Sequence, residues 1–120
     1  MSGKKYILDT NTALYVLGGK ILSSSLPEGE YAISVITELE LLSYPKITNT
    51  EELLIKHFLN DIQIIELSKE IKRRTVAIRK QSSLKLPDAI IAATAIETDS
   101  VLITRDKKLL KISSLNAIVL

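Results

Sequence analysis

The sequence has 120 residues, of which 46% are hydrophobic and 25% are charged, and its net charge is only +2. This size and composition predict one globular domain, residues 1–120, and exclude intrinsic disorder, while the small net charge identifies no partner. The absence of cysteine excludes disulfides and thiolate chemistry and favours a reducing, cytoplasmic setting, and the apolar runs are too short to span a membrane.

The first half of the chain alternates strand and helix signals. Residues 5–8 form a short apolar run typical of a buried strand, and residues 12–17 predict a helix that two glycines end. A loop follows over residues 23–29. Residues 31–34 then predict a second strand, which runs directly into a helix over residues 35–43.

The middle of the chain predicts two helices around a strand. Thr48 and Glu51 have the spacing of a capping box, which marks the start of a helix. A third strand is expected over residues 62–65. Ser68 then opens a basic amphipathic helix whose apolar face is spaced at helical intervals: Ile71, Thr75 and Ile78.

The last third of the chain adds a helix centred on residues 89–96 and strands over residues 101–104 and 117–120. Strands that alternate with helices favour an α/β fold in which helices cover both faces of a parallel sheet. We therefore expect a single domain with a five-stranded parallel sheet.

Acidic residues gather at one edge of this predicted sheet. Asp9 and Asp106 follow the carboxyl ends of two strands, and Pro87 suits the first position of a helix, which puts Asp88 in the first turn. The helix after the second strand carries Glu38 and Glu40. Because ligands of open α/β sheets bind outside the carboxyl ends of the strands, these side chains could form one site.

Each acid also has a purely structural explanation. Asp88 could complement the helix dipole, Asp9 could end a strand in a turn, and Asp106 could cap a surface turn. These independent explanations do not predict convergence at one edge.

Convergence of carboxylates suits metal chemistry. Mg²⁺ and Mn²⁺ prefer oxygen ligands. They can generate hydroxide near neutral pH, and a pair of them can stabilise the attacking and leaving oxygens when a phosphodiester is cleaved. No protein nucleophile is then required, and the only histidine, His57, is expected to be a structural or surface residue on its helix.

Four blocks of sequence in register, "ILDTN", "AISVITELELL", "LPDAIIAATAI" and "LITRD", strongly resemble PIN-domain nucleases, especially the VapC-type toxins of toxin–antitoxin pairs. The resemblance spans Ile7 to Asp106. It implies a PIN-like fold and a Mg²⁺- or Mn²⁺-dependent endoribonuclease that is inhibited by a small antitoxin and is commonly a homodimer. The acidic metal ligands and catalytic residues that it implies are Asp9, Glu40, Asp88 and Asp106, with Asn11 and Thr104 as supporting polar residues.

The choice of glutamate depends on this resemblance. Glu38 and Glu40 lie about 200° apart on a helical wheel. Each flanks at a similar angle the apolar stripe of the helix, so periodicity alone leaves both open. The residues of this stripe are Val35, Ile36, Leu39 and Leu42. In the family the glutamate generally falls six residues after the strand-ending serine and precedes a leucine, which from Ser34 gives Glu40.

Basic residues near the acids are candidates for binding RNA phosphates, because an acidic centre repels RNA until cations balance it. The candidates are Arg79, Lys85, Arg105 and Lys107. A solvated helix face explains the neighbouring cluster over residues 72–74 at least as well. With five aromatic residues in the chain, we expect recognition of backbone shape rather than base stacking.

Two other protein classes with an aspartate after a strand need acidic residues that this chain lacks. A haloacid-dehalogenase-type phosphatase needs a second aspartate where Asn11 stands, and a receiver domain needs an aspartate after the third strand, where residues 65–67 provide none. An RNA-processing PIN nuclease that is not a toxin, and a PIN fold that serves only as a binding module, both remain compatible with the sequence.

Overall fold

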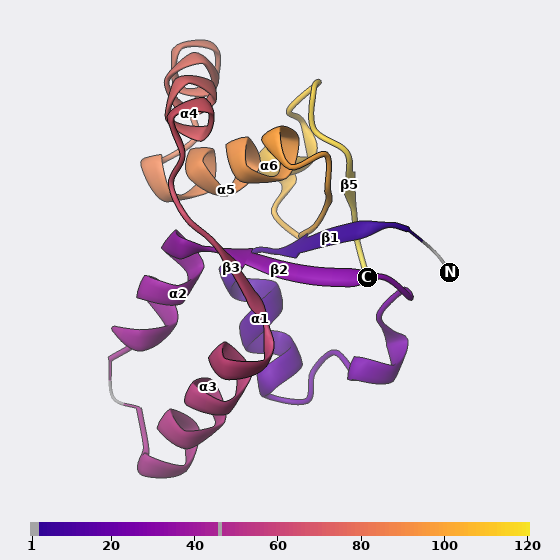
Figure 1. The fold of residues 1–120 in the computed structure, drawn as a ribbon, viewed down its shortest axis with the longest axis vertical. Helices are drawn as coiled ribbons and strands as arrows, with labels where there is room; N and C mark the ends of the chain where they lie inside the picture. Colours follow the sequence, from indigo (N-terminus) through magenta and orange to yellow (C-terminus); the bar gives the residue numbers. More distant parts are fainter. Residues whose placement is uncertain (1–2, 46) are drawn as a thin grey trace.

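A computed structural model describes residues 3–45 and 47–120, and its centre is a five-stranded parallel sheet in the order β3-β2-β1-β4-β5 (Figure 1). All five predicted strands are present. Their bounds are β1 Lys5–Leu8, β2 Glu30–Ser34, β3 Gln63–Ile65, β4 Val101–Ile103 and β5 Ala117–Ile118.

Helices connect the strands and cover both faces of the sheet, which confirms the predicted α/β architecture. Their bounds are α1 Thr10–Leu17, α2 Val35–Leu42, α3 Asn49–Asp61, α4 Lys69–Gln81, α5 Leu86–Glu97 and α6 Lys107–Leu110, and a 3-10 turn η1 spans Ser23–Ser25. Three differences from the sequence-based expectation stand out. The first helix starts at Thr10, two residues early, because Asp9 caps it; α6 and η1 lie where no helix was expected.

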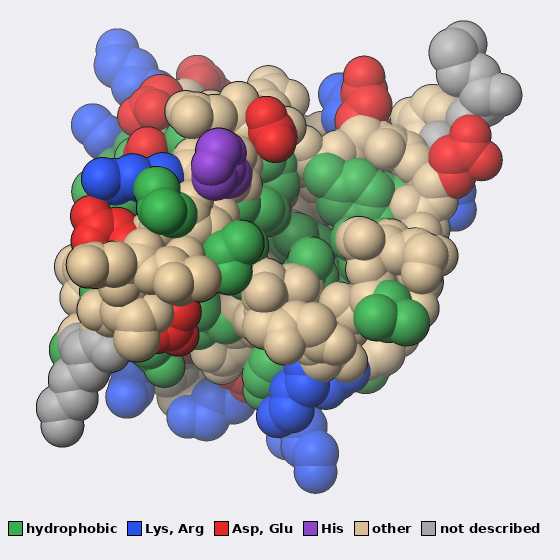
Figure 2. Space-filling view, turned by 90° about the horizontal axis from the view of Figure 1, so that it is seen from below, with side chains coloured by type: hydrophobic (Ala, Val, Ile, Leu, Met, Phe, Trp, Pro, Cys, Tyr) green, Lys and Arg blue, Asp and Glu red, His purple; other side chains and the backbone are tan. Residues whose placement is uncertain are grey.

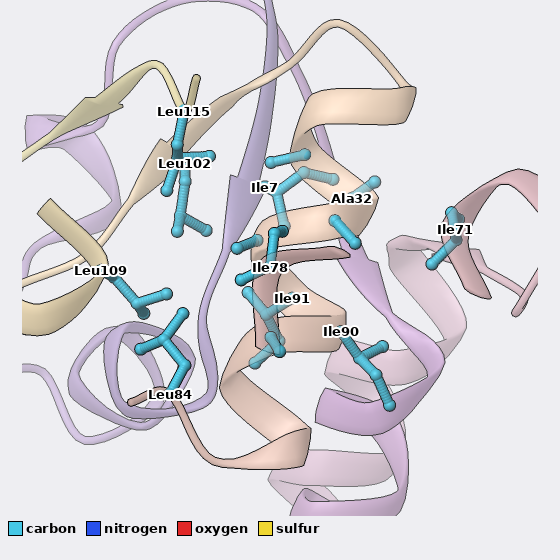
Figure 3. Packing of buried hydrophobic residues seen from close by; sticks show 14 residues of the cluster. Ile7, Ala32, Ile71, Ile78, Leu84, Ile90, Ile91, Leu102, Leu109 and Leu115 are labelled. Carbon is cyan, nitrogen blue, oxygen red and sulfur yellow. The ribbon is translucent and has the colours of Figure 1, made fainter. Parts of the chain in front are cut away.

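Alternating side chains of the strands supply the two halves of the core. Ile7, Ala32 and Leu102 point to the face covered by α4, α5 and α6 (Figure 3), and Leu8, Ile33 and Ile103 point to the opposite face, against α1, α2 and α3. This period of two is what a sheet buried on both faces requires.

The strand register brings distant segments together at the carboxyl edge. Leu8 lies opposite Ile103, so Asp9 and Thr104 leave the sheet side by side. β1 is the central strand, with β2 and β3 on one side of it and β4 and β5 on the other. The order of the strands therefore reverses at β1. Such a switch point opens a crevice at the carboxyl ends of the strands.

The buried face of α2 differs from the apolar stripe inferred from the sequence. Leu39 and Leu42, members of that stripe, are 54% and 52% exposed, whereas Thr37 and Leu41 are completely buried. The face of the helix that is turned inward carries Leu41, which packs in the core, and Thr37, whose hydroxyl lies 3.0 Å from that of Thr10 on α1. α2 therefore presents leucines to the surface.

The only histidine of the chain lies at the surface, which is one of the two positions expected from the sequence. His57 is exposed on α3, and it is the purple side chain on the face seen in Figure 2. Hydrophobic side chains also reach the surface on that face. Among the described residues, no helix is both long and apolar enough to cross a lipid bilayer.

Candidate active site

Asp9 is the most buried acid at the carboxyl edge, with 5% of its surface exposed. It is the N-cap of α1, where its Oδ1 accepts a hydrogen bond from the backbone N–H of Thr12 at 2.8 Å. The Thr12 hydroxyl in turn donates to the carbonyl of Ile103 at 3.0 Å, which ties α1 to β4. The aspartate is thus fixed by the first turn of the helix that it starts.

Thr104 links Asp9 to Asp106 across the edge. Its hydroxyl, which is completely buried, donates to Oδ2 of Asp9 at 2.5 Å and accepts from the backbone N–H of Asp106 at 3.0 Å. Asp106 itself caps α6, because its Oδ1 accepts from the N–H of Lys108 at 2.8 Å. One buried hydroxyl therefore binds both the carboxylate of Asp9 and the backbone of Asp106, two residues that lie far apart in the sequence.

Glu40 reaches this edge through two threonines. The Thr10 hydroxyl donates to Oε1 of Glu40 at 2.5 Å and lies 3.0 Å from the hydroxyl of Thr37. Since a hydroxyl carries one hydrogen and that of Thr10 goes to Glu40, Thr37 must donate to Thr10. These two hydrogen bonds, from Thr37 to Thr10 and from Thr10 to Glu40, orient the Glu40 carboxylate toward the start of α1, next to Asp9.

Asp88 lies in the first turn of α5, whose N-cap, Lys85, makes no side-chain capping bond. Burial raises the pKa of the Asp88 carboxyl above its ordinary value, and the charges of Asp106, Glu40 and Asp9 raise it further, whereas the nearby Lys85 lowers it. The negative charges of all three other acids thus reach Asp88.

The structure therefore brings Asp9, Glu40, Asp88 and Asp106 to one edge, and Glu38 is not among the charges that act on Asp88. Asn11, in contrast, is exposed on α1.

Thr10, Thr12 and Thr37 were missed as candidates for positioning the acids. Position is the signal that could have identified Thr10, because it directly follows the strand-ending aspartate. Thr37 could have been recognised only as a polar residue on the inner face of a helix, and that face was not predictable.

The basic candidates from the sequence have different environments. Arg105 donates from Nε to the Leu120 carbonyl at 2.9 Å and lies 5.0 Å from the centre of the Tyr15 ring. Lys85 is close enough to Asp88 to affect its pKa, whereas Lys107 and Arg79 are exposed in α6 and in the last turn of α4. Arg105 is therefore partly engaged by the protein itself.

The four acids offer only oxygen atoms as ligands, and these suit a hard cation such as Mg²⁺ or Mn²⁺. Within residues 3–45 and 47–120, however, no three Asp, Glu, His or Cys side chains are arranged to hold one ion together. These observations are compatible, since Mg²⁺ is commonly held by one or two carboxylates while waters and substrate phosphates complete its octahedron.

Comparison with known proteins places this geometry in context. A family profile described as "PIN domain" matches residues 6–115. A search of curated proteins finds no match.

Solved structures resemble the chain over almost its whole length. A toxin–antitoxin complex from Klebsiella pneumoniae is 32% identical, with a TM-score of 0.74 and coverage of 94% of this chain and 95% of that one. VapBC2 from Rickettsia felis, bound to a promoter DNA fragment, is 22% identical, with a TM-score of 0.82 and coverage of 97% and 98%. DNA-bound VapBC from Salmonella typhimurium is 20% identical, with the same TM-score of 0.82 and coverage of 97% and 98%.

Proposed function

Because the chain belongs to the PIN domain family, we propose that it is a metal-dependent endoribonuclease and the toxin of a toxin–antitoxin pair. The proposed catalytic and metal-binding residues are Asp9, Glu40, Asp88 and Asp106. The observation that carries the proposal is the gathering of these four carboxylates at the carboxyl edge of the sheet, where the negative charges of the other three add to the effect of burial in raising the pKa of Asp88. Repulsion of this kind opposes folding, and a bound cation would offset it.

The chain's own residues have distinct roles in this proposal. Asp9 and the backbone of Asp106 are both bound by the Thr104 hydroxyl, so they form the rigid part of the site. Glu40 accepts a hydrogen bond from the Thr10 hydroxyl, which orients its side chain. Asp88 lies in the first turn of α5, where the N-cap makes no side-chain hydrogen bond. Such preorganised charge is effective because it need not rearrange during the reaction.

A divalent cation at this edge would supply positive charge to the scissile phosphate and lower the pKa of a water molecule beside it. One or two of the carboxylates of Asp9, Glu40, Asp88 and Asp106 would hold it, and waters and substrate phosphate would complete its coordination. Hydrolysis by water needs no covalent intermediate with the protein, in keeping with the absence of cysteine from the chain.

The toxin assignment is supported by the toxin–antitoxin complex that is 32% identical to the chain. It is also supported by α2, where Leu39 and Leu42 are exposed on the helix that carries Glu40. Apolar side chains exposed next to a site are typical of a protein interface. We propose that a small antitoxin covers this surface, and that the protein forms homodimers.

The nuclease proposal is tested with purified protein and fluorescently labelled RNA. We expect cleavage with Mg²⁺ or Mn²⁺ and none with excess chelator, with activity restored when the metal is returned. Undiminished cleavage in chelator would refute the metal mechanism, and no cleavage of any RNA under metal-replete conditions would favour a non-catalytic binding module.

The toxin proposal has its own test. Expression of the protein alone in a bacterium should arrest growth, and expression of Asp88→Asn at the same level should not. Normal growth with demonstrably active enzyme would favour an RNA-processing nuclease instead.

A further inference from the structure

A hollow of about 460 Å³ lies between α4 and α6, on the face of the sheet that carries α4, α5 and α6. One wall is the C-terminal half of α4 with the loop that follows it, and the other is α6 with the loop leading to β5. The residues of the two walls are Arg74, Ala77, Ile78, Gln81, Ser82, Ser83 and Leu84, and Lys108, Lys111, Ile112, Ser113 and Ser114.

The hollow has the charge of an anion-binding surface. Its lining contains three cationic side chains, Arg74, Lys108 and Lys111, and no aspartate or glutamate. Arg74 is partly neutralised by Glu97, to which its Nε donates at 2.8 Å, so the two lysines of the α6 wall provide the free positive charge. Both lysines are exposed.

The remaining lining residues suit a ligand that has uncharged polar groups as well as negative charges. Serine hydroxyls occur on both walls and can donate to phosphate or ribose oxygens, and the Ser82 hydroxyl is already used by the Ile78 carbonyl at 2.8 Å. Ile112, which is half-buried, and the edges of the core residues Ile78 and Leu84 form the apolar part of the lining.

Each wall leads directly to an acid of the proposed site. Lys108 is the second residue of α6, and its backbone N–H donates to Oδ1 of the N-cap Asp106 at 2.8 Å. Leu84 lies four residues before Asp88, in the segment that leads into α5. One end of each wall is therefore near an acid of the proposed site, and a ligand that reaches both the acids and the hollow must be extended.

We propose that this hollow binds the sugar–phosphate backbone of single-stranded RNA a few nucleotides away from the scissile bond. Lys108 and Lys111 contact the phosphates, and the serines contact phosphate or ribose oxygens. The inference rests on the proposed ribonuclease function. It selects Lys108 and Lys111 from the cations that surround Asp106 in the sequence, because these two line the hollow whereas Arg79, Lys85, Arg105 and Lys107 do not. The role of those four in phosphate binding stays a prediction.

The test measures RNA affinity without requiring cleavage. Binding of a fluorescent single-stranded RNA of about 12 nucleotides is followed by anisotropy in chelator, as a function of salt, for wild type and for Lys108→Ala with Lys111→Ala. Loss of two phosphate contacts should weaken binding on the order of 10-fold and reduce the slope of log K against log salt by about 1.4, since each contact to a single strand contributes about 0.7.

Lys69→Ala with Lys72→Ala is the matched control, because it removes the same charge from exposed positions of α4 that do not line the hollow. Its affinity should stay within about 2-fold of wild type and its salt slope should not change. Equal losses in both double variants, or none in either, would overturn the inference.

Polyglutamate is the second probe. It offers negative charge without phosphate or ribose and should compete poorly with RNA. Competition at RNA-like concentrations that depends on Lys108 and Lys111 would overturn the RNA assignment in favour of an acidic protein segment. A failure of metal-dependent cleavage by wild type would count against the proposed function, and the anisotropy data would still decide the hollow.

Discussion

The first turns of α3 and α5 each contain a carboxylate, and the two are treated in opposite ways. On α3, Thr48 and Glu51 complete a capping box, with bonds of 3.0 and 3.1 Å. Hydrogen bonding with the backbone and side chain of Thr48 lowers the pKa of the Glu51 carboxyl. On α5 the N-cap makes no side-chain bond, and burial and neighbouring acids raise the pKa of Asp88.

The opposite pKa shifts distinguish two kinds of carboxylate. Glu51 stabilises the start of its helix, whereas Asp88 is held near other acids that repel it. Both positions complement the helix dipole, so the dipole does not distinguish them. What distinguishes them is the neighbours: a threonine at the start of α3, and three other acids at the start of α5. Paired substitutions at the two helices can therefore test whether the acidic edge is a site.

The largest expected effect is on catalysis. Asp88→Asn should reduce RNA cleavage on the order of 100-fold or more, because even loss of a residue that only supports a metal ligand commonly costs about 10–100-fold. Glu51→Gln should leave cleavage unchanged, since glutamine also completes a capping box. Cleavage rates at saturating Mg²⁺ and circular dichroism of both variants provide the check, and an active Asp88→Asn enzyme would contradict the assignment.

The same comparison within α2 should give a second large effect. Glu40→Gln should lower cleavage at least about 10-fold, because only Glu40 is held at the edge by Thr10. Glu38→Gln, on the same helix, should remain within a few-fold of wild type. If Glu38→Gln were the inactive variant, the assignment of Glu40 would be wrong.

A smaller effect is expected on stability. Without metal, Asp88→Asn should melt at a higher temperature than wild type, because it removes one charge from the repelling group. Mg²⁺ at about 100 times its dissociation constant should stabilise wild type by about 2.7 kcal/mol and the variant much less. Thr48→Ala should instead lower stability by about 1 kcal/mol regardless of metal. Thermal melts with chelator and with Mg²⁺ distinguish these outcomes, and a wild type indifferent to Mg²⁺ would contradict a metal site.

The smallest effect is the pH dependence of stability without metal. The folded-state pKa of Asp88 is raised above its ordinary value of 3.8. Its protonation therefore favours the folded state below that value, and this contribution disappears as the pH rises through the raised pKa. Glu51, with a lowered pKa, has the opposite sign: its contribution exists above its ordinary value of 4.5 and is lost as the pH falls through the lowered one.

Urea titrations between about pH 3 and 8 can resolve the two signs. The stability difference between wild type and Asp88→Asn should grow in favour of the variant as the pH rises, whereas that between wild type and Glu51→Gln should grow in favour of wild type. The same sign in both series would contradict the contrast between the two helices.

The sequence was sufficient for the strands and for the edge at which the acids gather. Strands such as residues 5–8 are recognisable because a sheet buried on both faces needs continuous apolar runs. α6 could not be predicted, because four residues after Asp106 carry too little periodicity to distinguish a helix from a turn.

The candidate site was less predictable in its supporting contacts than in its acids. The inward face of α2 makes tertiary contacts, such as that between Thr37 and Thr10, which a helical wheel does not contain. Leu39 and Leu42 were consequently grouped with the buried stripe although they are exposed. Asn11 matched a motif position but lies exposed on α1, and its supporting role stays a prediction.

The bond between Thr104 and Asp9 also determines when the acidic edge can form during synthesis. The two residues are 95 positions apart, and a ribosome needs about 5–20 s to add that many residues. α1 and α2 can begin to fold in that interval, while the hydroxyl that fixes Asp9 and the backbone of Asp106 has not yet been made. The acidic edge can therefore be completed only after almost the whole chain has been synthesised, so fragments that end before Thr104 lack the group that fixes Asp9.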